Sequence, residues 1–179
     1  MLKRLIDEIN TALEHDCYFA ALALALTLPD ICGKAEYPEA GVTKRYIDWY
    51  NETVRYTQKC PSIHNQETSM PYLSGEVVYN LRNSFLHQGN PNIEVEKIHA
   101  EENKVDQFTL RLQEKNQFDI YADAASVTET FAGNQSLGKE KRYTVNVRRL
   151  CMILTRCAEG YYNEFPEKFV FFNYHIEER

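Results

Sequence analysis

The first 28 residues carry the strongest helical pattern in the chain. Apolar residues recur there at spacings of three and four, the period of one helix face, at positions 2, 5, 6, 9, 13, 17, 20, 24 and 28. The second half of this stretch, CYFAALALALTL at 17–28, is apolar on every side and must be covered on more than one side. We expect one long helix or two in tandem, at the centre of a bundle or at a subunit interface.

Length and composition favour one mainly helical domain covering residues 1–179. Hydrophobic residues make up 44% and charged residues 26%, and there are few glycines and prolines, 7 and 6. The longest apolar run, 17–28, has 12 residues, whereas a membrane span needs about 20, so no membrane association is expected. Five cysteines without a CxxC pair indicate reduced thiols and a cytoplasmic protein.

The chain is acidic, with a net charge of -6, and it has no overall positive field that would hold a nucleic acid. Binding to RNA would have to be local. Two basic clusters could supply it, TKRY at 43–46 and GKEKRYTVNVRRL at 138–150. Lys44 and Arg45 are weak candidates for lining an RNA path, although such charges are more often simply exposed.

The remaining pattern predicts three further helices separated by loops. Thr43 can cap a helix over 43–58, and Ser74 can cap a helix that Gly89 ends. Apolar spacing over 144–163 predicts the last helix. Loops are expected at 28–41, 59–71 and 123–138.

The period changes to two after Pro91, which is typical of strands. We expect a small antiparallel β meander, inserted at about 92–122, with strands at 93–99, 104–113 and 117–122. The aromatic tail, 167–179, is β-prone, and the sequence leaves open whether it forms a late strand or a packing arm.

The stretch YNLRNSFLHQG, residues 79–89, places three polar residues on an otherwise apolar helix: Arg82, Asn83 and His87. Histidine can take and give a proton near neutral pH, and arginine matches the geometry of phosphate. Together they suit phosphodiester cleavage without a metal, with Asn83 orienting His87 or the substrate. Because Arg82 and His87 are five residues apart, about 140° around an ideal helix, a second copy of the helix would help them share a target.

Structural roles are the alternative for both residues. Arg82 could pair with Glu76 or Asp48, and His87 could donate to free carbonyls at the end of its helix. The other histidines show no metal-ligand spacing, so no metal or cofactor is expected: His15, His64, His99 and His175.

The segment LRNSFLHQG resembles the signature of the HEPN superfamily, the higher eukaryote and prokaryote nucleotide-binding domains. That signature is an arginine, a polar residue that is most often asparagine, and a histidine a few positions on, carried by one helix of a bundle. Arg82, Asn83 and His87 match it. The resemblance implies an up-and-down helical bundle, to which the β meander would be an addition.

The same resemblance implies a homodimer whose motif helices meet at the two-fold axis and form one cleft. Many members are metal-independent endoribonucleases of toxin–antitoxin, antiphage or RNA-processing systems, and they leave a cyclic phosphate; a toxin of this kind would have an antitoxin partner. Others have no activity and bind nucleotides or protein partners. Arg82 and His87 become catalytic candidates by this resemblance, with Asn83 in support.

Overall fold

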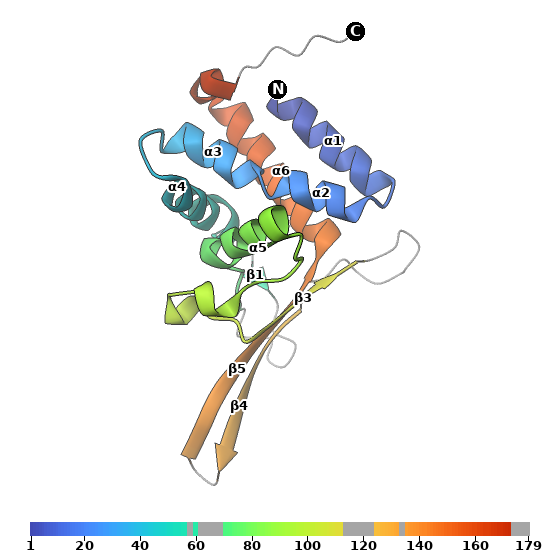
Figure 1. Cartoon of the computed structure of the whole chain (residues 1–179). Helices are drawn as coiled ribbons and strands as arrows, with labels where there is room; N and C mark the ends of the chain where they lie inside the picture. Colours follow the sequence, from blue (N-terminus) through green and yellow to red (C-terminus); the bar gives the residue numbers. More distant parts are fainter. Residues whose placement is uncertain (57–58, 61–69, 113–123, 133–134, 173–179) are drawn as a thin grey trace.

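The computed structural model describes residues 1–56, 59–60, 70–112, 124–132 and 135–172 and is mainly helical with a small sheet (Figure 1). The α-helices are α1 (Leu2–Glu14), α2 (Tyr18–Ala25), α3 (Leu28–Glu36), α4 (Val42–Trp49), α5 (Gly75–Gln88) and α6 (Val147–Glu164). A π-helical turn, η1 (Tyr50–Arg55), continues α4, and three 3-10 segments follow later in the chain: η2 (Val95–Lys97), η3 (Glu101–Asn103) and η4 (Pro166–Phe172).

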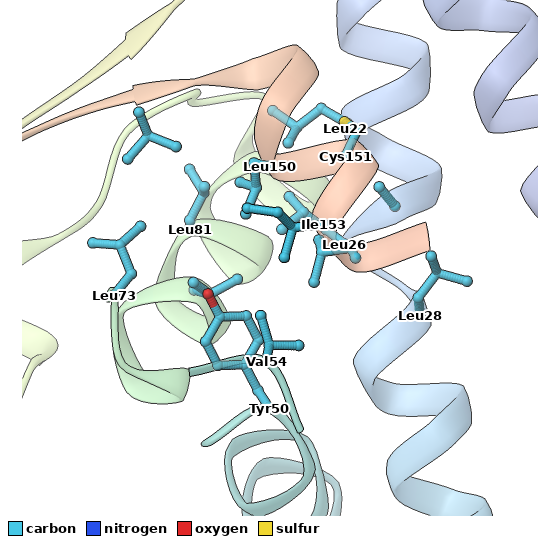
Figure 2. Close-up of a cluster of buried hydrophobic side chains, with 14 of the residues drawn as sticks. Leu22, Leu26, Leu28, Tyr50, Val54, Leu73, Leu81, Leu150, Cys151 and Ile153 are labelled. Carbon is cyan, nitrogen blue, oxygen red and sulfur yellow. The ribbon is translucent and has the colours of Figure 1, made fainter. Parts of the chain in front are cut away.

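Helix α6 supplies the centre of the core. It packs against α1, α2 and α3, and its Leu150 and Leu154 are fully buried. Figure 2 shows Leu22 of α2, Leu26 directly after it and Leu81 of α5 pointing into the same cluster. The apolar stretch at 17–28 therefore receives much of its cover from helices of its own chain.

The N-terminal pattern forms two helices in tandem, as expected, but the loop expected at 28–41 is wrong in its first part, where α3 runs over Leu28–Glu36. Pro29 lies in the first turn, where a helix has no hydrogen bond for proline to remove. Gly33 permits close packing on α4, because a Cβ there would overlap the carbonyl of Arg45.

One helical stretch in the described part of the chain, Tyr18–Glu36, has the length and mean hydropathy, 1.3, that would allow a membrane crossing. It comprises α2 and α3, and 56% of its apolar window is buried inside the protein. Core helices of proteins without membrane spans pass the same test.

The two other helices of the first half begin close to where the sequence places them. Helix α4 with η1 extends from Val42 to Arg55, and the last residues of the expected helix, 57–58, lie outside the described residues. Helix α5 is as expected: the Ser74 hydroxyl accepts a hydrogen bond from the Val77 amide at 3.3 Å, and Gly89 ends it with φ 69°.

The sheet differs from the expected meander. Its strands are β3 (Gln107–Arg111), β4 (Ala124–Ala132) and β5 (Gln135–Asn146), in the order β3-β5-β4, with β3 parallel and β4 antiparallel to β5. A separate short pair is formed by β1 (Lys59–Cys60) and β2 (Met70–Pro71). In Figure 1, β4 and β5 project away from the helices.

Two predictions for individual segments around the sheet are wrong, those for 93–99 and 123–138. The strand expected at 93–99 is instead a loop with the turn η2, because side chains of α5 bind its backbone. The loop expected at 123–138 contains β4 and the start of β5, because these two segments pair with each other as antiparallel strands. The strand expected at 104–113 contains β3, whereas 117–122 lies outside the described residues.

The start of the C-terminal tail packs back onto the helices. Phe169 of η4 is buried, and the Lys168 ammonium lies 2.5 Å from the Glu36 carboxylate of α3. Of the two possibilities for the tail, residues 167–172 form a packing arm, and 173–179 lie outside the described part.

Close packing at Gly75 is testable by substitution. A Cβ at this position would lie 2.7 Å from the Ile47 carbonyl oxygen of α4. We expect Gly75→Ala to lower the free energy of unfolding by about 1–3 kcal/mol, because it forces α4 and α5 apart. Chemical denaturation measures this.

Gly160→Ala is the matched control, since a Cβ there meets nothing within 4 Å in the middle of α6. It should leave stability unchanged or raise it by about 0.5–1 kcal/mol. Equal effects of the two substitutions would show that the α4–α5 contact is not tight.

Candidate functional site

A groove of about 660 Å³ has one face of α5 as its floor. The floor residues recur at spacings of three and four, which places them on one side of the helix: Glu76, Tyr79, Asn80, Asn83 and His87. Helix α4 lines one part of the groove with Thr43 and Ile47. The α5–β3 loop, residues 89–106, lines another part with Glu94, Lys97 and His99.

The three motif residues come together in this groove. Arg82 Nη1 donates a hydrogen bond to Asn83 Oδ1 at 2.8 Å and lies 3.3 Å from His87 Nε2. Arg82 and His87 are about 140° apart on the ideal helix, yet their side chains meet within a single chain. The reason is the length of the arginine side chain, which spans the angle between the two positions.

The contact with Arg82 fixes how His87 is used. A guanidinium has donors and no acceptor, so a hydrogen bond at this contact requires His87 Nε2 to accept, as in the neutral ring with its proton on Nδ1. His87 itself is exposed at the end of α5, whereas Arg82 is half-buried. A positioned cation thus lies beside an accessible acceptor nitrogen.

The structural alternative for Arg82 receives no support from the described residues. Asp48 pairs with Lys44, and Glu76 accepts hydrogen bonds from the α5–β3 loop. Within the ranges that the structure describes, Arg82 forms no ion pair with either acid. Its side chain is instead committed to Asn83 and His87.

Side chains of α5 hold the α5–β3 loop in place. The buried Asn80 amide bonds both backbone groups of Glu94, donating to its carbonyl at 3.0 Å and accepting from its N–H at 2.8 Å. The Glu76 carboxylate accepts from the His99 N–H at 2.6 Å and from Asn103 Nδ2 at 3.0 Å. These anchors carry Lys97 and His99 to the groove.

Both carboxylates in the groove are engaged by donors. Burial acts to raise the pKa of Glu76, but the bonds from Asn103, His99 and Ala100 outweigh it and hold the pKa below 4.5. The hydrogen bond from Lys97, together with that from Gln88, lowers the pKa of Glu94 despite partial desolvation. Both carboxylates therefore carry a negative charge at neutral pH, and the Lys97 ammonium offsets the charge of Glu94.

The weaker candidates lie elsewhere. The Lys44 ammonium pairs with Asp48, and Arg45 Nη2 lies 2.8 Å from Asp30 Oδ1; neither residue lines the groove. In the second basic cluster, Arg148 is buried and donates to the Leu13 carbonyl. These three residues of the two basic clusters therefore form contacts within the protein.

No group of three His, Cys, Asp or Glu side chains suited to a metal ion occurs within the described ranges. Sequence reasoning missed the nine groove residues outside the motif: Thr43, Ile47, Glu76, Tyr79, Asn80, Gln88, Glu94, Lys97 and His99. The spacing of residues 76, 79, 80, 83 and 87 could have revealed the face of α5 that lines the groove. The groove residues of the α5–β3 loop could not be found in this way, because tertiary hydrogen bonds place them.

The anchoring by Glu76 predicts a pH-dependent contribution to stability. Because folding lowers the pKa of Glu76, its contribution is present above the unfolded value near 4.5 and is lost as the pH falls through the lower folded value. We expect Glu76→Gln to destabilise the protein at pH 7 and to differ little from wild type at strongly acid pH. Urea unfolding across pH measures the difference.

The exposed Glu159→Gln on α6 is the control and should match wild type at every pH. A Glu76→Gln variant whose stability deficit stays constant down to acid pH would contradict the role assigned to this carboxylate.

Comparison of the chain with protein-family models, with curated protein sequences and with solved structures found no match. Inference about function therefore rests on the groove, on its three motif residues and on their resemblance to the HEPN signature.

Proposed function

We propose that the protein is a HEPN-type, metal-independent endoribonuclease that acts as a homodimer. One observation carries this proposal: Arg82, Asn83 and His87 meet through their side chains in an open groove. A motif match by itself is weak, but a cation and a histidine placed 3.3 Å apart at an accessible surface are what phosphodiester cleavage requires.

In the proposed reaction, His87 Nε2 takes the proton of a ribose 2′-hydroxyl. The 2′-oxygen then forms a bond to phosphorus, the bond from phosphorus to the 5′-oxygen breaks, and the departing oxygen takes a proton from water. The products are a 2′,3′-cyclic phosphate and a 5′-hydroxyl. Arg82 leaves His87 for the phosphate and stabilises its developing charge, with Asn83 holding the guanidinium in range.

An exposed apolar patch next to the motif supports the homodimer. Phe19 of α2 and Leu86 of α5 are 52% and 37% exposed, and the Phe19 ring lies 5.9 Å from that of Phe85. Exposed apolar side chains mark an association surface where they form a contiguous patch. Leu86 directly precedes His87, so a partner covering this patch would bring a second motif close to the first.

A cytoplasmic toxin or antiphage nuclease is the biological setting that the resemblance implies. The second candidate is a HEPN-like module without activity that binds a nucleotide or a protein. The presence of Glu76 and Glu94 in the groove favours this binding module, since carboxylates reduce the affinity for a polyanion such as RNA. The ribonuclease remains the proposal because both acids are already bonded to donors.

Cleavage of RNA in EDTA tests the nuclease. We expect wild type to cut mixed single-stranded RNA, His87→Ala to lose about 10²–10⁴-fold in rate, and Arg82→Ala about 10²–10³-fold. The rates are measured by gel or by fluorescence-quenched oligonucleotides.

His15→Ala, at an exposed site after α1, is the control and should retain full rate. An inactive wild type, or equal rates for wild type and His87→Ala, would remove the nuclease. Nucleotide binding lost in Arg82→Ala, with RNA intact, would favour the binding module.

Mixed dimers test whether two chains share one cleft. Arg82→Ala and His87→Ala chains, refolded together, form heterodimers that carry one Arg82 and one His87. We expect activity to reappear well above that of either variant, because one intact Arg82 and one intact His87 then lie in the same cleft at the two-fold axis. An inactive mixture, with heterodimers verified by mass, would place each complete site within one chain.

A further inference from the structure

The groove extends well beyond the motif. Its floor runs along α5 from Glu76 to His87, a span of 12 residues, and the 11 steps between them correspond to roughly 16 Å at about 1.5 Å each. A single phosphodiester bond occupies a small part of this length. The remaining part is lined by residues that the proposed reaction does not use, among them Tyr79, Lys97 and His99.

Tyr79 is presented to the groove by two contacts. The Thr43 hydroxyl lies 3.0 Å from the Tyr79 hydroxyl, and the Tyr46 ring packs edge-on at 5.1 Å between ring centres. The contacts come from α4, so the ring is held in place before a ligand binds. Tyr79 lies one turn before Asn83 on the same face of α5, which puts an aromatic side chain beside the motif.

Lys97 supplies a positive charge outside the motif. Its ammonium lies 2.7 Å from Glu94 Oε2, and its side chain is 58% exposed. An exposed ion pair of this type is weak, so a phosphate can draw the ammonium away from Glu94. The neighbouring His99 lies at the Glu76 end of the floor, because its N–H is bonded to that carboxylate.

An aromatic ring and a spaced cation along one groove are the features with which proteins hold single-stranded nucleic acid without reading its sequence. We propose that this groove holds one RNA strand of several nucleotides, with Tyr79 against a base beside the cleaved phosphate and Lys97 on an adjacent phosphate. The Glu94 carboxylate that binds Lys97 also accepts a hydrogen bond from Gln88, so this ammonium lies toward the C-terminal end of α5. This inference rests on the proposed function. A length of roughly 16 Å accommodates about five stacked nucleotides at ~3.4 Å each.

Length-dependent binding tests the inference. The probes are 2′-O-methyl RNA of two and of six nucleotides, which lacks the attacking hydroxyl and cannot be cut, with affinity measured by fluorescence anisotropy. We expect wild type to bind the hexanucleotide about tenfold or more tightly than the dinucleotide. Lys97→Gln should weaken hexanucleotide binding, leave dinucleotide binding unchanged and lower the salt slope by about 0.7.

Two further variants separate the roles of the groove residues. Glu94→Gln should tighten hexanucleotide binding, because it removes the competitor of the phosphate for Lys97. Tyr79→Leu should weaken binding of both lengths, whereas Tyr79→Phe, which keeps the ring, should weaken it less. Lys3→Gln and Tyr56→Leu are controls at exposed positions outside the groove and should match wild type. Circular dichroism establishes that each variant is folded.

The outcomes distinguish this inference from the proposed function. Three results would overturn the inference, even where unmodified RNA is cut. They are equal affinity for the two lengths, no affinity for the hexanucleotide, and a Lys97→Gln variant that binds as wild type does. Length-dependent binding that Lys97→Gln removes supports the groove, even where unmodified RNA stays intact and the catalytic proposal fails. If a second copy of the chain fills the groove, the hexanucleotide does not bind, and this result also overturns the inference.

Discussion

Helix α5 packs one face into the core and lines the groove with another, and the arrangement of the site depends on these two faces. Its buried face places Val77, Val78 and Leu81 in the core. The opposite face is occupied by polar residues, of which Asn80 and Glu76 bind the backbone of the α5–β3 loop. Movement of this helix would therefore displace the core, the loop and the motif together.

The consequence is a site that is organised before any ligand binds. Asn80 satisfies both backbone groups of Glu94, which would otherwise be unpaired at a partly buried position. Arg82 is held by Asn83 and reaches His87 without help from a second chain. A partner is thus not needed to bring arginine and histidine together, and the proposed dimer would instead add a second pair to the cleft.

The parts of the fold that local chemistry decides were predictable from the sequence. Ser74 and Gly89 set both ends of α5, and spacing at three and four residues revealed α1 and α6. Helix α3 was missed because Pro29 and Gly33 were taken as helix breakers, although proline suits a first turn and glycine permits contact with α4. The alternation at 93–99 was misleading because tertiary bonds from α5, not a neighbouring strand, determine that backbone.

The candidate site shows the same limit. The motif was visible as three residues on one helix, and the reach of the arginine side chain made a contact between Arg82 and His87 possible despite the angle between their ideal positions. Tyr79 was hidden among the apolar residues of α5, and Lys97 and His99 enter the groove through loop contacts that no periodicity encodes.

The central claim is that Arg82 and His87 of α5 cleave RNA through attack of the 2′-hydroxyl, without a metal. Mass spectrometry of the RNA ends produced in EDTA tests it most directly. The account predicts fragments ending in a 2′,3′-cyclic phosphate and beginning with a 5′-hydroxyl, and it predicts that His87→Ala yields none. Intact RNA, or fragments with 5′-phosphate ends, would contradict it.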